Sequence, residues 1–229
     1  MALKAIARLR SKVLTALRSE YGFSKAAGGF LVRRFAHGYA GVDLQLSQFR
    51  DVMYVNVGWT FLGLPGFLQS RMLAPDEFQL LDCAMHDRLH MVSKTEAVPT
   101  EWRADSDAAA DGLIRMLLDV ADATCDSIGA HFADPLALPS ELPPELVAHD
   151  FAERKRLAGG RGGTTPRDYA LVRRALHGFY PSAFPLALSL CWVSQTSGNR
   201  EDAKKYFELA HAAAELPQDR TIMALLSTG

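Results

Sequence analysis

The most regular pattern in the chain is an alternation of apolar and polar residues between positions 30 and 60. A period of two is typical of half-buried strands, because successive side chains point to opposite faces of a sheet. The apolar members form three runs: Phe30 and Val32; Val42, Leu44 and Leu46; Met53, Val55, Val57 and Trp59. The connections between the runs are short and rich in turn-forming residues, which favours antiparallel neighbours over parallel crossovers. We therefore expect an antiparallel meander.

A fourth strand is predicted in "LLDCAMHDRLHMVS", residues 80–93, where Cys83, Met85, Leu89 and Met91 alternate with more polar residues. In this strand Cys83 lies on one face, and His86, Arg88 and His90 lie on the other. On a helix, Cys83, His86 and His90 would instead share a face and suggest a zinc site. Because the alternation favours a strand and no fourth ligand is near, we expect no metal here.

Helical periodicity precedes and follows these strands. One side of a first helix would carry Leu3, Ile6, Leu9, Val13, Leu14 and Leu17, with Lys4, Arg8 and Lys12 opposite. We interpret it as an amphipathic helix packed on the sheet; its basic excess also suits a transit peptide or a membrane-surface helix. No apolar run reaches the ~18 residues of a spanning helix.

A long helix is predicted up to Phe132, with an apolar stripe through Leu117, Val120 and Ile128. Its aspartates, Asp111, Asp119, Asp122 and Asp126, are interpreted as an acidic solvent-exposed face rather than a magnesium or calcium site, because those ions need ligands converging from loops or several elements. The fold class expected is therefore α+β, a four-stranded antiparallel meander packed by an N-terminal helix and a long helix.

The C-terminal part of the chain is predicted to be helical. Residues 184–217 read as two helices joined at "TSGNRE", where Gly198 closes the first and Asn199 begins the second. Gly198, Ala203, Phe207 and Ala210 resemble the second half of a tetratricopeptide repeat, and the first half does not match. A single unit of this kind is interpreted as a closing hairpin, because a solenoid needs about three repeats.

The segment between these two parts is rich in proline, glycine and charge. "GGRGGTT" invites comparison with a phosphate-binding loop, but the lysine of that motif is missing. We predict an α+β sheet domain over residues 1–135, a linker or mobile loop over 136–168, and a helical segment over 169–229 that packs on the first domain or stands apart. Basic residues concentrate in the predicted loop, including Arg154, Arg156 and Arg161.

Five pieces of the chain resemble successive blocks of a bacterial family called domain of unknown function 4304. The pieces are "YGFSKAAGGFLVRRF", "VDLQLSQF", "MYVNVGWTF", "DCAMHDRLHMV" and "EWRADSDA", which together cover about residues 10 to 135. The chain departs from the family pattern in the fourth block, where Cys83 and His86 are not adjacent. The resemblance implies helices against an antiparallel sheet and implies no activity.

Composition narrows the class of partner. A net charge of −1 and a pI near 6.7 give no reason to expect nucleic acid, which is usually met by a strongly basic domain. Three well-separated cysteines, each in an apolar run, are typical of buried thiols in a reducing compartment, so we expect a cytoplasmic protein without disulfides.

No motif for nucleophilic catalysis, paired carboxylates, nucleotide binding or a cofactor is found in the sequence, which favours a non-enzymatic protein. The function expected is protein interaction, most specifically an immunity or adaptor protein that sterically blocks a toxin or effector. The candidate partner-binding residues are Gln45, Asn56, His86, Arg88, His90, Arg154, Arg156 and Arg161. The alternative is a small enzyme or ligand-binding protein that uses the polar sheet face around His86, Arg88 and His90.

Overall fold

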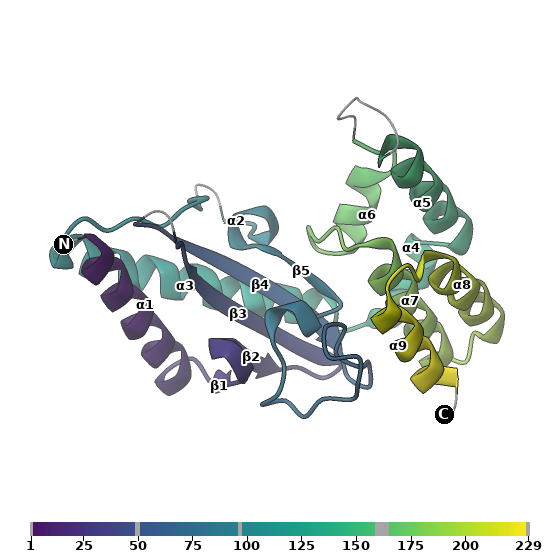
Figure 1. The fold of residues 1–229 in the computed structure, drawn as a ribbon, viewed down its shortest axis with the longest axis horizontal. Helices are drawn as coiled ribbons and strands as arrows, with labels where there is room; N and C mark the ends of the chain where they lie inside the picture. The colour runs from purple at the N-terminus through teal and green to yellow at the C-terminus, as the bar shows by residue number, and fades with distance from the viewer. Residues whose placement is uncertain (1, 49–50, 96–97, 159–164, 228–229) are drawn as a thin grey trace. The chain divides into compact units, whose positions relative to one another are not determined.

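The computed structural model describes residues 2–48, 51–95, 98–158 and 165–227 (Figure 1). These residues form two compact units, which are described separately. Unit 1 is drawn from Met1–Leu62 and Leu73–Ala133, and unit 2 from Gly63–Met72 and Asp134–Gly229. The boundary after Ala133 lies close to the end of the sheet domain predicted from the sequence.

Unit 1 combines a sheet with helices. Its elements are α1 (Ala2–Ser19), β1 (Ser24–Lys25), the 3-10 turn η1 (Ala27–Gly29), β2 (Leu31–Arg34), β3 (Gly38–Leu46), β4 (Met53–Phe61), the 3-10 turn η2 (Leu80–Asp82), β5 (Met85–Arg88), α2 (Leu89–Val92) and α3 (Asp107–His131). The α+β class is confirmed.

The strands form one antiparallel sheet in the order β1-β2-β3-β4-β5, so the predicted meander is confirmed. The described sheet has five strands rather than the four predicted. The additional strand, β1, consists of Ser24 and Lys25, and both residues are exposed. A strand of two exposed residues produces no alternation of apolar and polar residues, so the sequence pattern could not reveal it.

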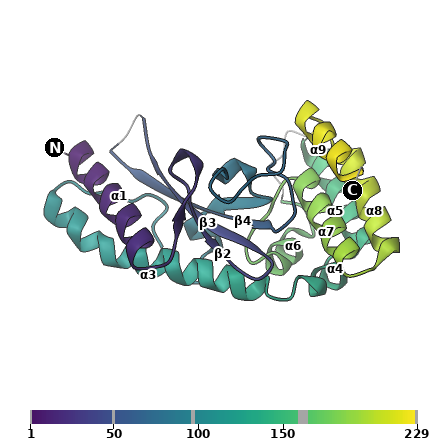
Figure 2. The ribbon, with the colours of Figure 1, turned by 90° about the horizontal axis from the view of Figure 1, so that it is seen from below.

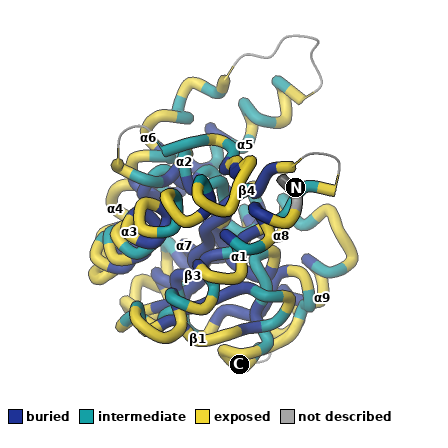
Figure 3. Tube along the Cα trace, turned by 90° about the vertical axis from the view of Figure 1, so that its left-hand side faces the viewer, coloured by how far each residue is buried: buried dark blue, intermediate teal, exposed yellow. Residues whose placement is uncertain are grey.

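One face of the sheet is covered by the two long helices. Val42, Val57 and Trp59 are fully buried on this face, as the alternation predicted. Most residues of β3 and β4 are buried (Figure 3). Helices α1 and α3 lie side by side and both contact β3 (Figure 2). The first helix therefore packs on the sheet with its apolar stripe, and Ile6 and Leu9 are fully buried there.

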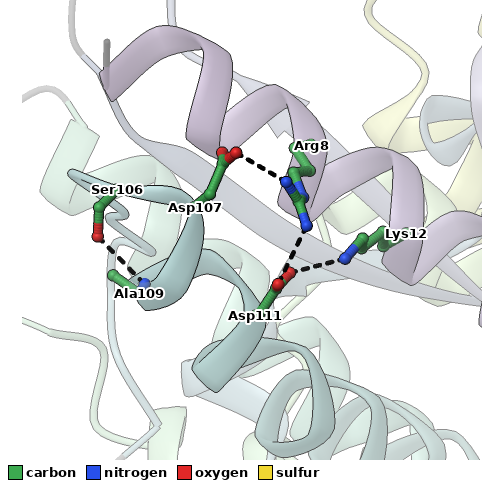
Figure 4. Close-up of polar contacts among 6 residues, drawn as sticks. All are labelled: Arg8, Lys12, Ser106, Asp107, Ala109 and Asp111. Atoms are coloured by element: carbon green, nitrogen blue, oxygen red, sulfur yellow. Dashed lines mark hydrogen bonds and ion pairs between the residues drawn. The ribbon is translucent and has the colours of Figure 1, made fainter.

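Ion pairs join α1 to the beginning of α3 (Figure 4). Arg8 contacts Asp107 at 2.7 Å and Asp111 at 3.1 Å, and Lys12 contacts Asp111 at 2.7 Å. Ser106 caps α3, because its hydroxyl accepts a hydrogen bond from the backbone N–H of Ala109. Part of the acidic face of α3 is thus occupied by basic residues of α1 rather than by solvent alone.

A second ion-pair group joins the sheet to α3. Arg33 of β2 contacts Asp122 and Asp126, each at 2.6 Å, and its guanidinium lies 4.8 Å from the centre of the Phe23 ring. The expectation that these aspartates are simply solvent-exposed was therefore wrong for Asp122, which is only 28% exposed. Sequence periodicity could not show this, because the partner lies on a distant strand.

Unit 2 is helical. Its elements are the 3-10 turn η3 (Pro135–Ala137), α4 (Leu138–Glu141), α5 (Pro144–Ala158), α6 (Tyr169–Ala175), α7 (Ala183–Thr196), α8 (Arg200–Ala213) and α9 (Pro217–Ser227) (Figure 1). The predicted hairpin is present as α7 and α8, which pack on each other. As expected, Gly198 has a positive φ of 79° and Asn199 caps α8 through the backbone N–H of Asp202.

The segment 136–168, predicted as a linker or mobile loop, is helical over most of its described residues. The prolines that suggested a break stand in the first turns of η3 and α4, and Pro144 is the first residue of α5. Proline is well tolerated at these positions, because the N–H that it lacks has no partner within the helix. The glycine-rich stretch at 159–164, including Arg161, lies outside the described residues.

Candidate functional site

Three polar residues on neighbouring strands are hydrogen-bonded across the second face of the sheet. The register places Asp43 of β3 opposite Asn56 of β4, and Asn56 opposite Arg88 of β5. Asn56 Nδ2 donates to Asp43 Oδ2 at 3.1 Å, and Arg88 Nη1 donates to Asn56 Oδ1 at 2.8 Å. The structure thus brings together two predicted residues, Asn56 and Arg88.

An aromatic ring extends this network. The Arg88 guanidinium lies 4.2 Å from the centre of the Tyr54 ring, and the Tyr54 hydroxyl donates to Glu101 Oε1 at 3.1 Å. Glu101 is held beside β4 because the next residue, Trp102, forms a bridge with Met53. Stacking and hydrogen bonding together hold the Arg88 side chain in one orientation.

Gln45 lies beside this network and borders a pocket. It is exposed and stands opposite Tyr54 in the β3–β4 register. The pocket measures about 480 Å³; its polar lining residues include Arg10, Asp43, Gln45 and Gln79, and Phe30 and Leu80 add apolar surface. The predicted residue Gln45 therefore lies at the edge of a small concavity.

The remainder of this face is covered. Phe78 and Cys83 pack with Phe30 and Val32 in a buried cluster. Gly58 accommodates this cover, since a Cβ atom there would lie 2.9 Å from Cys83 Sγ. The uncovered part, called the polar sheet face below, comprises the exposed or partly exposed Asp43, Gln45, Tyr54, His86 and Arg88, together with Asn56, which lies between Asp43 and Arg88 and is buried.

His86 lies on the polar sheet face, two residues before Arg88, and the residue as a whole is exposed. The pKa of its imidazole is nevertheless lowered from 6.5, chiefly because the surrounding protein displaces water from the ring. A neutral His86 leaves Arg88 as the cation at this end of the face.

His90 does not lie on the sheet, so the prediction that it shares a strand face with His86 and Arg88 was wrong. The strand β5 ends at Arg88, and His90 belongs to α2. The buried residues Leu89 and Val92 are three apart, which suits a helical turn, whereas Met91 is 38% exposed. Within the described residues, no three His, Cys, Asp or Glu side chains are placed to hold a metal ion.

The predicted basic loop is not the setting of Arg154 and Arg156, since both belong to α5. Arg156 is exposed, whereas Arg154 is held inside unit 2. Arg154 Nε donates to the fully buried Asp150 at 2.6 Å, Nη1 donates to the carbonyl of Pro181 at 2.5 Å, and the guanidinium lies 3.8 Å from the centre of the Tyr180 ring. Arg154 is therefore held by contacts within unit 2, and its role in partner binding stays a prediction.

The three cysteines are buried thiols. Burial raises the pKa of Cys125 to about 12 and that of Cys191 to about 11, and it also raises the pKa of Cys83. At neutral pH these groups are protonated and cannot act as thiolate nucleophiles.

Sequence reasoning missed several residues of this site. Asp43 and Tyr54 share the parity of Gln45 and Asn56, so the alternation itself could have placed them on the polar sheet face. Arg10 and Gln79 carry no such signal, because a helix and a loop bring them to the pocket from distant parts of the chain.

Searches against models of protein families, curated proteins and solved structures gave no match for this chain. In the described residues, no helix has both the length and the apolar character required to cross a bilayer.

Proposed function

We propose that this chain is a cytoplasmic protein-interaction protein whose partner docks on the polar sheet face. The observation that carries the proposal is the orientation of Arg88, which is fixed by Asn56 and Tyr54 before any partner binds. Arginine and tyrosine are enriched among residues that dominate binding energy, and a side chain that is already ordered loses less entropy on binding.

The charge of Arg88 supports the same proposal. Among the described residues, no carboxylate forms an ion pair with it, whereas Arg33 of the same sheet contacts two. An ordered cation without a carboxylate partner on an open surface is suited to a carboxylate of another protein. Gln45 and Asp43 supply further hydrogen-bonding groups around it.

In its most specific form, the proposal makes the partner a toxin or secreted effector. An interface of the ordinary size, ~1,600 Å² in total, would cover the partner's active site and block it sterically, with no chemistry required of this chain. The cytoplasmic location is supported by the three buried thiols, a state typical of a reducing compartment.

A second candidate function is favoured by the pocket beside Gln45. A volume of about 480 Å³ suits a small molecule, and Arg10 and Asp43 place opposite charges in its lining. In this alternative the chain is a ligand-binding protein or small enzyme, and the polar sheet face recognises a metabolite.

The test is affinity capture from a lysate of the native host, followed by mass spectrometry, with three baits. These are the unaltered protein, Arg88→Glu, and Arg115→Glu as a control with the same charge change at an exposed site of α3. We expect one stoichiometric partner with the unaltered and control baits, and its loss with Arg88→Glu. Circular dichroism of each bait verifies that it is folded.

Two results would count against the proposal. Retention of the partner by Arg88→Glu would place the interface elsewhere. Absence of any partner, combined with a metabolite that raises the melting temperature and loses this effect in Gln45→Ala, would favour the ligand-binding alternative.

A further inference from the structure

The pocket beside Gln45 contains two opposite charges that do not neutralise each other. Arg10 lines it from α1, and Asp43 lines it from β3. Among the described residues, no ion pair joins these two side chains, whereas Arg8 and Lys12 of α1 are paired with aspartates of α3. A cation and a carboxylate that stay separate in one concavity are suited to a ligand that carries both charges.

Arg10 retains donors for the negative group of such a ligand. Its Nε donates to the carbonyl of Leu44 at 2.6 Å, and this bond holds the guanidinium at the wall of the pocket. The described residues supply no acceptor for Nη1 or Nη2. These two nitrogens lie in one plane and match the two oxygens of a carboxylate.

Two glycines leave room beside the Arg10 guanidinium. Gly28 and Gly29 have positive φ angles of 64° and 85°, which glycine adopts at little cost. A Cβ atom at Gly29 would lie 3.2 Å from Arg10 Nη2, and one at Gly28 would lie 3.7 Å from Gln79 Oε1. The Gln79 oxygen accepts from the backbone N–H of Asp82, so its NH₂ group is a further donor at this end of the pocket.

Asp43 retains one oxygen for the positive group of the ligand. Asn56 Nδ2 donates to Asp43 Oδ2 at 3.1 Å, and no described side chain donates to Oδ1. The positive group must lie close to the negative one, because Arg10 is bonded to Leu44, the residue that follows Asp43. An ammonium and a carboxylate on one carbon atom meet this requirement.

The rest of the pocket offers apolar surface. Its apolar lining includes Leu46 and Leu80, which are partly exposed, and Leu81, which is 53% exposed. An apolar group of the ligand would remove this surface from water. The volume of about 480 Å³ is typical of pockets for small molecules.

We infer that this pocket binds a free α-amino acid with an apolar side chain. Arg10 and Gln79 bind its carboxylate, Asp43 binds its ammonium group, and its side chain packs on Leu46 and Leu80. The inference rests on the second candidate function, that of a ligand-binding protein, and names the class of ligand.

The experiment measures the binding of four small molecules to the full chain by isothermal titration calorimetry. L-leucine carries both charges and an apolar side chain. N-acetyl-L-leucine lacks the ammonium group, L-leucinamide lacks the carboxylate, and glycine lacks the side chain. NMR spectra locate the site, because the backbone N–H groups of Gly28 and Gly29 and the side-chain amide of Asn56 lie at or next to the pocket.

Two variants of the pocket are compared with controls of the same chemistry. In Arg10→Lys the single ammonium group can still donate to the Leu44 carbonyl, but the paired Nη donors are gone. In Asp43→Asn the side chain can still accept from Asn56, but its charge is gone. The controls are Arg115→Lys and Asp105→Asn, both at exposed positions outside the pocket.

We expect L-leucine to bind and the other three molecules to bind at least about tenfold more weakly. Arg10→Lys and Asp43→Asn should each weaken L-leucine binding by at least about tenfold, and the controls should leave it unchanged. Asp43→Asn should not weaken the binding of N-acetyl-L-leucine, which has no ammonium group to lose.

Several results would overturn the inference. These are no binding of L-leucine, equal binding of L-leucine and its two singly charged analogues, equal losses in the pocket variants and the controls, and NMR shifts confined to residues outside the pocket.

The ligand class and the ligand-binding function can fail separately. A metabolite without both charges that raises the melting temperature, and loses this effect in Gln45→Ala, would overturn the amino-acid inference and leave the ligand-binding function standing. Binding of L-leucine that is lost in Asp43→Asn would support both, whether or not a protein partner is captured.

Discussion

The hydroxyl of Tyr180 donates a hydrogen bond of 2.8 Å to Asp150, a carboxylate with no solvent exposure in unit 2. Arg154 contacts the same carboxylate from one turn away on α5. Burial, followed by the hydrogen bond to Asp150, raises the pKa of Tyr180, so the phenol remains a donor. The buried charge of Asp150 thus has one cationic and one neutral partner, which join α5 to the segment before α7.

We expect Asp150→Asn to destabilise unit 2 by about 3 kcal/mol, because it leaves Arg154 largely enclosed without its counter-charge. Hydrogen exchange followed by mass spectrometry should show faster exchange in α5, α6 and α7 and unchanged exchange in α3. The control is Glu208→Gln at an exposed position of α8, where we expect no change. Native protection of α5 in Asp150→Asn would show that the network contributes little.

Two glycines of α3 should respond oppositely to alanine. At Gly112 an added Cβ meets nothing within 4 Å, so Gly112→Ala should stabilise unit 1 by up to about 1 kcal/mol through helix propensity. At Gly129 the added Cβ would lie 2.2 Å from the Phe35 ring, so Gly129→Ala should destabilise unit 1 by about 2 kcal/mol. Urea unfolding followed by tryptophan fluorescence measures both, since Trp59 and Trp102 are buried in unit 1. Equal shifts in the two variants would contradict this prediction.

The sequence predicted the parts of the fold whose signal is local. Period two identified β3 and β4 because Val42, Val55 and Val57 bury one face, and the Gly198-Asn199 pair identified the turn between α7 and α8. The prolines at residues 135–144 led to a wrong prediction of a linker, because proline is found both after the end of a helix and in the first turn of one. Which of the two roles a proline has depends on its position relative to the helix, and the sequence pattern did not show where the helices begin.

The sequence predicted only those residues of the candidate site that the alternation of side chains along a strand assigns to one face. Parity placed Asn56 and Arg88 on one face, and the register then brought them into contact. Arg154 was expected in a mobile loop rather than in a packed helix, because its partners, Asp150 and Tyr180, are set by tertiary packing. Arg10 reaches the edge of β3 from α1, a contact between residues 34 positions apart that no local pattern encodes.

The three cysteines should be unreactive in the native protein. Burial raises their pKa values, to about 12 for Cys125 and about 11 for Cys191, so the thiolate fraction at pH 8 is very small. We expect Ellman's reagent to label all three rapidly in denaturant and far more slowly without it. Rapid stoichiometric labelling of one cysteine under native conditions would contradict its burial, and mass spectrometry would identify the residue.

The carboxyl of Asp111 should titrate below its ordinary pKa of 3.8, because the hydrogen bond from Lys12 and then the charge of Arg8 favour its ionised form (Figure 4). Because this carboxyl has a lower pKa in the folded state than in the unfolded state, its ionised form stabilises the fold. The contribution is fully present at pH values above the unfolded pKa and is lost as the pH falls through the folded pKa. NMR titration of the side-chain carboxyl should show the lowered pKa and its partial return in Lys12→Met. Because both groups are exposed, added salt should shrink the shift, and Lys204→Met should leave it unchanged. An Asp111 pKa that is the same in Lys12→Met and in the unaltered chain would show that Lys12 does not hold this carboxylate in solution.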